Sequence, residues 1–406
     1  MANRRNADGM AGSWRDWAAS HIRDPLLRLR FLQAVAPAPE SPARRGAHWK
    51  LLLCILCLLA VPASLLLARG LRSWMPPARA PFTPTLPAPA AGGEHVFPPV
   101  QPVWLVEQTS GFETYSNGLR IDNRFSVAHH RRSYRVYAAD GTEGADSSRR
   151  SDPAGIVFHT TESLQVPFEP GRNSQLKRVG ESVLDFVARR RAYHFLIDRF
   201  GRVYRVVAET DAANHAGNSV WSDGRWVYVN LNESFLGVSF EAHSSEVHSS
   251  KGRSASGYSG AAINLAQVRA AAMLTEMLRN RYAIAAGNCV THAQVSVNPA
   301  SMLAGYHTDL ASGFPFEQLG LPDNYGVPLP AIALFGFHYD AHFSGLEATS
   351  LYLGVERGEQ AFRRTAAGLH VSLDAFRQAR QARYREERAA ARQSIHDTDL
   401  EAAAAE

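Results

Sequence analysis

The sequence of 406 residues predicts an α/β fold, in which a mixed β-sheet is flanked by helices and preceded by one transmembrane helix and a proline-rich linker. Three observations predict it. An apolar run stands near the N-terminus, a segment dense in proline follows it, and short apolar runs then alternate with helical patterns. The net charge is +5, and basic residues are dispersed among nearly as many acids. This dispersion argues against a dedicated nucleic-acid surface.

Residues 51–69 form the predicted membrane-spanning segment. Eighteen consecutive residues, from Leu51 to Ala68, are uncharged and mostly apolar. As a helix they would be about 27 Å long, which is near the hydrocarbon thickness of a bilayer. Nine basic residues lie in 1–50 and only three follow the run closely, so we expect 1–50 in the cytoplasm and the rest of the chain outside it. A cleaved signal peptide is the alternative, but the long N-terminal region favours an uncleaved signal anchor.

Residues 70–102 form the predicted linker. Nine prolines lie between Pro76 and Pro102, and such a segment is typical of an extended, semi-rigid spacer. It would hold a globular domain away from the bilayer. The chain has three cysteines, of which Cys54 and Cys57 lie in the apolar run. Cys289 therefore has no disulfide partner, and we expect a buried thiol there.

The globular domain is expected over residues 103–325. Apolar residues at helical spacing predict helices at 176–187 and 265–278, the second beginning with the capping pair Asn264 and Gln267. Short apolar runs predict buried strands, two of them forming a hairpin around Phe200 and Gly201. These runs are 155–159, 193–198, 202–207 and 235–240.

The remaining residues give weaker patterns. In the C-terminal extension 326–375, apolar clusters at 332–337 and 351–355 predict either extra strands on the same core or a small accessory module. Residues 376–406 are predicted as a charged helical tail, because the stretch from 373 to 392 is rich in Arg, Ala, Gln and Glu and indicates a solvated helix. Glu401 to Glu406 would be its frayed acidic end.

Three side chains lie where a strand or helix meets a loop: His159, His292 and Asp309. Two imidazoles and one carboxylate, with a fourth position open to water, are the ligands of a catalytic zinc site. Periodicity alone does not select these three residues among sixteen histidines. Structural roles are expected for His338, Asp340 and His342, and for six isolated histidines: His129, His130, His194, His243, His248 and His370.

Residues 155–325 resemble the zinc-dependent N-acetylmuramoyl-L-alanine amidases, which share their fold with the peptidoglycan recognition proteins and the amidase lysozymes of certain phages. The matching segments, in the family's order, are Ile156 to Thr161, Tyr193 to Tyr204, Asn214 to Asn218, Asn232 to Phe240 and Val290 to Ser296. The resemblance implies Zn²⁺ as cofactor and peptidoglycan as substrate, cut between N-acetylmuramic acid and L-alanine. With the predicted anchor, it implies a single-pass protein of the bacterial inner (cytoplasmic) membrane whose catalytic domain lies in the periplasm or outside the membrane.

The resemblance also implies the metal ligands. By position, His159 and His292 are the two histidine ligands and Asp309 is the third. In the family the third ligand is a Cys or Asp that usually opens a turn with Pro and Gly. Here the spacing from His292 is longer and no Pro follows directly, so His307 is a rival ligand. If Asp309 binds the metal, His307 lies beside the scissile carbonyl, where it can stabilise an oxyanion.

For catalysis, one branch of the family has a Glu where this chain has Ser239. Other members rely on a Tyr just before the His of the Tyr-His-Phe strand, and Tyr193 matches that position. Glu241 is a weaker candidate base, on the same strand face as Ser239. Three further residues are expected to bind substrate: Thr160, His215 and Asn232. For His215 a loop position without special role stays open.

An alternative function is a catalytically inactive peptidoglycan-binding protein of the same fold, because relatives without the third ligand bind wall fragments without cutting them. The third ligand after His292 decides between the two functions. With Asp309 in place catalysis is expected, and without a working third ligand only recognition is expected. The sequence indicates neither the stem-peptide preference nor the oligomeric state.

Overall fold

The structure, a computed structural model, describes residues 101–140, 148–248, 256–259, 263–339 and 349–405. These residues lie within one compact unit, Glu94–Glu406. The predicted cytoplasmic segment, membrane anchor and nearly all of the linker fall outside the described residues, so they stay predictions. Among the residues that are described, no helix combines the length and apolar character needed to cross a bilayer.

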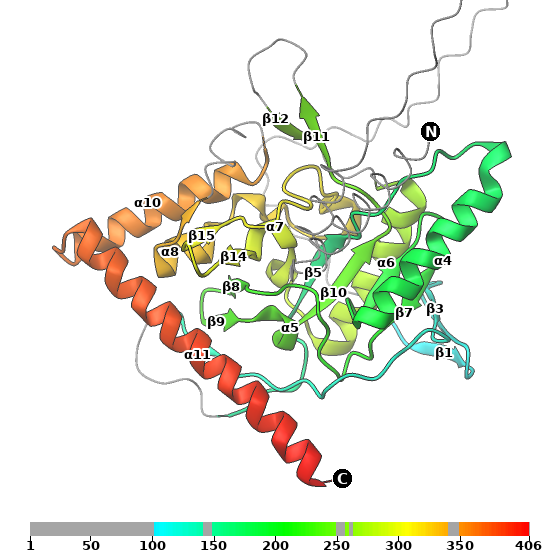
Figure 1. Cartoon of the computed structure of the whole chain (residues 1–406), viewed down its shortest axis with the longest axis horizontal. Helices are drawn as coiled ribbons and strands as arrows, with labels where there is room; N and C mark the ends of the chain where they lie inside the picture. The colour runs from blue at the N-terminus through cyan, green and yellow to red at the C-terminus, as the bar shows by residue number, and fades with distance from the viewer. Residues whose placement is uncertain (1–100, 141–147, 249–255, 260–262, 340–348, 406) are drawn as a thin grey trace, which may run out of the picture. The chain divides into compact units, whose positions relative to one another are not determined.

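An eight-stranded mixed sheet lies at the centre of this unit (Figure 1). In spatial order its strands are β1 (Leu105–Gln108), β2 (Phe112–Tyr115), β3 (Arg120–Asp122), β7 (Val203–Arg205), β6 (Phe195–Ile197), β10 (Phe235–Phe240), β5 (Gly155–Thr160) and β13 (Cys289–Thr291). β10 runs parallel to β5 and β6, and β13 runs parallel to β5. Four strands therefore end at the same edge. The predicted hairpin is confirmed, since β6 and β7 pair antiparallel around Gly201, whose φ is 78°.

Helices flank the sheet, as the fold class predicted. Leu184 and Val187 of α4 (Asn173–Arg190) pack against Leu196 of β6, whereas α6 (Leu265–Tyr282) packs against the neighbouring Ile197. Since successive strand residues point to opposite faces, the two helices cover opposite faces of the sheet. The predicted capping box is present: Asn264 Oδ1 accepts from Gln267 N at 3.1 Å, and Gln267 Oε1 accepts from Asn264 N at 3.2 Å.

Smaller elements complete the fold. One three-stranded sheet contains β4 (Tyr137–Ala138), β9 (Trp226–Val229) and β8 (Val220–Ser222), and another contains β14 (Val297–Asn298), β15 (Leu303–Ala304) and β16 (His338–Tyr339). β11 (Ser245–His248) pairs with β12 (Ser256–Ser259). The short helices are α5 (Leu231–Ser234), α7 (His292–Val295), η1 (Pro170–Arg172), η2 (Ala286–Asn288), η3 (Glu317–Leu319) and η4 (Asn324–Gly326).

The apolar clusters after residue 325 form helices, not the extra strands that were one of the two expectations. They lie in α8 (Pro330–Phe335) and at the start of α10 (Tyr352–Gly368), and Ile332 and Val355 belong to the main hydrophobic core. The physical reason is local at α8, because Pro330 at the first turn favours a helix and Gly336, with φ of 64°, ends it.

The C-terminal tail is the long helix α11 (Leu373–Ala405), so the predicted helix is confirmed. It is not simply solvated. Phe376 and Tyr384 are buried, and Tyr384 packs edge-on against Phe335 and Phe337. The prediction missed this contact because the few apolar residues of α11 are widely spaced in a strongly charged segment. Cys289 is the buried thiol that was expected, and burial raises its pKa to about 12.

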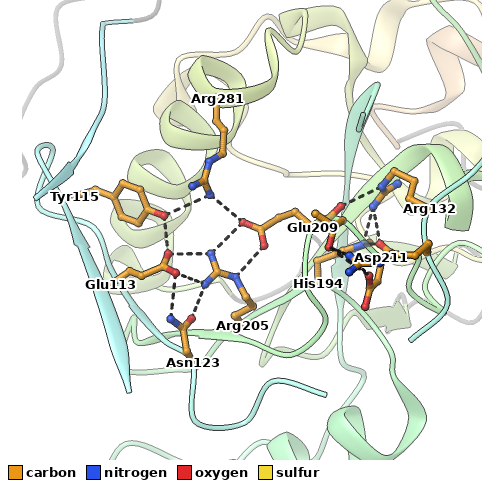
Figure 2. A network of polar contacts seen from close by, with 11 residues as sticks. Glu113, Tyr115, Asn123, Arg132, His194, Arg205, Glu209, Asp211 and Arg281 are labelled. Atoms are coloured by element: carbon orange, nitrogen blue, oxygen red, sulfur yellow. Dashed lines mark hydrogen bonds and ion pairs between the residues drawn. The ribbon is translucent and has the colours of Figure 1, made fainter. Parts of the chain in front are cut away.

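A buried polar network connects the N-terminal strands to the sheet (Figure 2). Arg205 of β7 donates to Glu113 of β2 at 2.9 and 3.0 Å and to Glu209 at 2.9 and 3.0 Å. Burial raises the pKa of Glu113, but hydrogen bonds from Arg205 and Tyr115 outweigh it and hold the pKa below its usual value. A paired, buried charge thus links β2 to β7 and helps to hold the N-terminal strands in the sheet.

Candidate metal centre

The structure brings together the three side chains predicted as metal ligands. Asp309 Oδ1 lies 2.8 Å from His292 Nδ1, and Asp309 Oδ2 lies 3.6 Å from His159 Nδ1. One ligand atom from each of the three residues lies within 4.8 Å of the others, and all three side chains are buried. The imidazoles of His159 and His292, 4.5 Å apart between ring centroids, are close enough to share one ion.

The parallel strands place the two histidines. His159 is near the end of β5, and His292 is the first residue of α7, directly after β13. Because β5 and β13 are parallel neighbours, their carboxyl ends meet. Thr291 and Gln294 form a capping box around the start of α7, with Gln294 Oε1 accepting from Thr291 N at 2.9 Å. The strand-to-helix turn that holds His292 is therefore fixed by its own cap.

Side chains from other elements fix the loop that carries Asp309. Ser296 Oγ accepts from His307 N at 2.9 Å and donates to His307 O at 3.1 Å. The hydroxyl of Tyr325 donates to Leu310 O at 2.7 Å. Leu310 has φ of 60°, the left-handed region that a non-glycine residue rarely adopts. Such strain is found at functional sites, where the surrounding structure holds it.

The charges suit a cation. Burial, and then the neighbouring His292, lower the pKa of His159 to about 4, so its imidazole is neutral at neutral pH. Burial alone would raise the pKa of Asp309, but the neighbouring His292 and then His159 outweigh it and hold the pKa well below its usual value. A neutral imidazole and an ionised carboxylate are the protonation states that metal ligands require.

The donor set fits zinc. Tetrahedral zinc with bonds of about 2.0–2.2 Å places its ligand atoms roughly 3.3–3.6 Å apart. The two oxygens of Asp309 lie 2.8 Å from His292 Nδ1 and 3.6 Å from His159 Nδ1, the first below that range and the second at its upper end. Two imidazoles and one carboxylate also leave a fourth position for water or substrate.

His215 contacts His159, one of the predicted metal ligands. Its Nδ1 lies 3.1 Å from His159 Nε2, and its Nε2 lies 3.2 Å from Phe235 O. Because a carbonyl only accepts, we assign the proton of His215 to Nε2, and Nδ1 then accepts from His159 Nε2–H. This leaves the lone pair of His159 on Nδ1, the atom nearer to Asp309. These contacts favour a positioning role for His215 over the predicted role in substrate binding.

The other two predicted substrate-binding residues are also engaged within the protein. Asn232 Oδ1 accepts from the backbone N–H groups of His215, Ala216 and Gly217 at 3.0, 2.7 and 3.2 Å. Asn232 therefore holds the turn that carries His215. Thr160 is buried at the end of β5, and its hydroxyl donates to Glu162.

Tyr193 and His307 lie beside the cluster. The Tyr193 ring is 5.0 Å from the His159 ring, and its φ of 62° is again left-handed. Burial and the negative charge of Asp309 raise the pKa of Tyr193 above its usual value, so the phenol is a hydrogen-bond donor at neutral pH. His307 stacks on His292, with ring centroids 4.5 Å apart, and is not one of the three clustered ligands.

Glu241 lies in different surroundings. Its carboxylate accepts from Arg199 N at 3.3 Å, and its charged neighbours are Asp198, Arg199 and Arg202, at the β6–β7 turn. This position does not favour the predicted role as base. Ser239, opposite His159 in the β10–β5 register, has only a hydroxyl.

Sequence reasoning missed Glu162. Its carboxylate accepts from Ser244 N at 3.1 Å and pairs with His243 at 3.0 Å, and its charge raises the pKa of Tyr193 after the larger effects of burial and Asp309. The only signal in the sequence was its place three residues after His159. Its φ of 48° is in the left-handed region, and no spacing rule predicts that.

Comparison with known proteins agrees with this geometry. Residues 149–309 match the family model described as N-acetylmuramoyl-L-alanine amidase. Over these residues, which we call the amidase segment, the chain is similar to that family. The match to the amidase family ends at Asp309, the third member of the cluster. A search of curated proteins gives no match.

Solved structures similar to the amidase segment and its flanks come from bacteria and an insect. AmiD from E. coli is 19% identical, with a TM-score of 0.34, over 55% of this chain and 94% of its own. AmpDh3 from Pseudomonas aeruginosa is 21% identical, with a TM-score of 0.29, over 44% of this chain and 64% of its own, which is less than two thirds. The Drosophila peptidoglycan recognition protein SD is 17% identical, with a TM-score of 0.24, over 41% and 90%.

Replacing His215 with phenylalanine is expected to weaken zinc binding about 10- to 100-fold, the usual effect of losing a residue that orients a metal ligand. An aromatic ring is kept, but His159 loses the acceptor that fixes its tautomer. Competition titration with a zinc chelator measures the affinity. An unchanged zinc affinity with a raised KM would instead support the predicted role in substrate binding. Asn214→Ala, in the same turn, is the matched control, because its side chain contacts Arg190 O.

Proposed function

We propose that the amidase segment hydrolyses the amide bond between N-acetylmuramic acid and L-alanine in peptidoglycan, with zinc bound by His159, His292 and Asp309. The observation that carries the proposal is the approach of these three donors to within 4.8 Å inside a segment of the amidase family. A bound zinc ion supplies a Lewis acid for the amide carbonyl and lowers the pKa of water toward neutrality.

The protein's own residues orient and stabilise the reacting groups. His215 holds His159 in the tautomer that presents Nδ1. Tyr193, protonated at neutral pH because its pKa is raised, donates a hydrogen bond to the oxygen on which negative charge develops. His307, which stacks on His292, would supply a second donor to that oxygen. Glu162 is a carboxylate at the margin of the site that can accept a proton.

A binding protein without turnover is the second candidate. The observation that favours it is the position of the acids: Ser239 stands where one branch of the family has Glu, and Glu241 lies at the β6–β7 turn. The complete set of three ligands favours the enzyme, because recognition alone needs no buried carboxylate between two imidazoles.

Digestion of purified peptidoglycan by the full chain is expected to release stem peptides with a free alanine amino group, detectable by mass spectrometry. Treatment with a chelator should abolish release, and added zinc should restore it, since the metal activates the attacking water. His159→Ala, which removes one ligand, should stay inactive after zinc is added.

Two results would contradict parts of the proposal. Release that survives the chelator and persists in His159→Ala would remove the role of zinc. Retention of muropeptides without any cleavage, by a protein that contains one equivalent of zinc, would establish the binding protein instead.

A further inference from the structure

A cavity of about 250 Å³ lies between α11 and the turn that follows His215. Its polar lining comes from two sides. Helix α11 contributes Tyr384, Arg388 and Arg392, and the other side includes Asn218, Asn230 and Asn232. No Asp or Glu is among the described residues that line it. The cavity is thus bordered by positive charge and amide groups, with no acid to balance them.

The three α11 residues share one face of the helix. They are spaced by four residues, the separation that places side chains above one another on a helix. Arg388 Nε donates to Asn218 Oδ1 at 3.2 Å, which fixes the guanidinium against the turn. A guanidinium held in this way presents its planar donors to a carboxylate or phosphate at little further entropic loss.

Tyr384 contributes a buried hydroxyl. Its ring is fully buried between Phe335 and Phe337, with centroids 5.5 and 4.8 Å away, and its hydroxyl has no hydrogen-bond partner in the part of the chain that is described. Buried hydroxyls are nearly always hydrogen-bonded. Burial raises the pKa of Tyr384 to about 12 against the opposing charges of Arg388 and Arg392, so the hydroxyl is a donor and both guanidinium groups are its electrostatic neighbours.

We propose that this cavity binds a small oxyanion, a carboxylate or a phosphate group, through Arg388, Arg392 and the hydroxyl of Tyr384. The donors have the charge and the number that such a group requires, and the ligand supplies the acceptor that Tyr384 lacks. The proposal does not depend on amidase activity, because none of these residues belongs to the metal cluster.

The position of the cavity gives the ligand a structural effect. Its lining includes Gly217 and Asn232, and Asn232 Oδ1 accepts from His215, Ala216 and Gly217. An oxyanion here joins α11 to the turn whose opposite side holds His215 against His159. Binding therefore stabilises the turn that positions a metal ligand.

Isothermal titration of the full chain tests the proposal, with inorganic phosphate in one arm and N-acetyl-D-alanine, which has a single carboxylate, in the other. Ionic strength is held constant. We expect binding in at least one arm, weakened about tenfold or more in Arg388→Gln/Arg392→Gln because two charged donors are lost. Tyr384→Phe keeps the packed ring and should weaken binding about threefold or more by removing one donor.

The control variant Arg364→Gln/Arg385→Gln removes the same charge from exposed positions of α10 and α11 and should bind as the unaltered chain does. His159→Ala should also bind normally, which separates the cavity from the metal cluster. Binding of phosphate alone, of the carboxylate alone or of both supports the site and names its ligand. No binding in either arm, or equal affinity in Arg388→Gln/Arg392→Gln, would overturn it.

Discussion

Asp309→Asn is expected to abolish amide hydrolysis and to weaken zinc binding strongly. The loss of affinity should exceed the roughly 10- to 100-fold that follows when a residue that only hydrogen-bonds to a metal ligand is removed. The carboxylate lies between the two imidazoles, 2.8 Å from His292 Nδ1 and 3.6 Å from His159 Nδ1. Asparagine has nearly the same shape but no charge. The amide would leave the cation with neutral ligands only, in a buried site where an unbalanced charge is strongly disfavoured.

His307→Asn is the matched comparison, because His307 was the rival ligand and lies against the same imidazole. It should keep the metal while hydrolysis falls about 100- to 1,000-fold, the range expected when a donor to the oxyanion is lost, because the asparagine side chain is too short to reach that oxygen. Zinc content after dialysis and the zinc affinity by competition give the readouts. Loss of zinc in His307→Asn together with its retention in Asp309→Asn would exchange the two assignments.

Arg132→Met is expected to lower the free energy of unfolding by about 3–5 kcal/mol, as when one partner of a buried charged network is removed. Arg132 is 2% exposed, and its guanidinium donates to four backbone carbonyls, those of Glu209, Asp211, Glu233 and Phe235. Figure 2 shows it beside His194 and Asp211. Methionine would fill part of the space and remove one donor from each of these buried carbonyls.

The neighbouring Arg131 provides the control. Its side chain is 75% exposed and pairs with Asp211 at 3.1 Å, so Arg131→Met should change stability by no more than about 1 kcal/mol. Urea denaturation followed by tryptophan fluorescence measures both variants. The free energy of unfolding of Arg132→Lys, which keeps the charge but loses the planar guanidinium, should fall between those of the two methionine variants. Arg132→Lys replaces Arg132→Met in the comparison if the methionine variant does not fold. Equal stabilities of Arg131→Met and Arg132→Met would contradict the assignment.

Local patterns predicted those elements whose signals lie within a few residues. The apolar run at β5, the Phe200-Gly201 turn between β6 and β7, and the Asn264–Gln267 cap of α6 each depend on neighbours in the sequence. The fold brings together the three predicted ligands, His159, His292 and Asp309, which were identified through resemblance. His194 was correctly expected to be a satisfied core residue, since its Nδ1 accepts from Gly237 N at 2.9 Å.

Other features could not be predicted because they join residues far apart in the chain. Arg132 contacts carbonyls about a hundred residues away, and Arg388 reaches Asn218 across 170 residues. A helix rich in charge such as α11 gives no local sign that Tyr384 will be buried. Glu162 depends on a left-handed turn that no spacing rule indicates.

By itself the sequence determined the α/β class, the principal strands and helices, and the two histidines of the cluster, because hydrophobic period, capping and motif order are encoded in short stretches of chain. The tertiary structure decided that Asp309 rather than His307 joins the two histidines, that His215 fixes the tautomer of His159, and that α11 encloses a basic cavity. Each of these depends on where a side chain lies relative to a distant backbone, and that is set only when the whole core has packed.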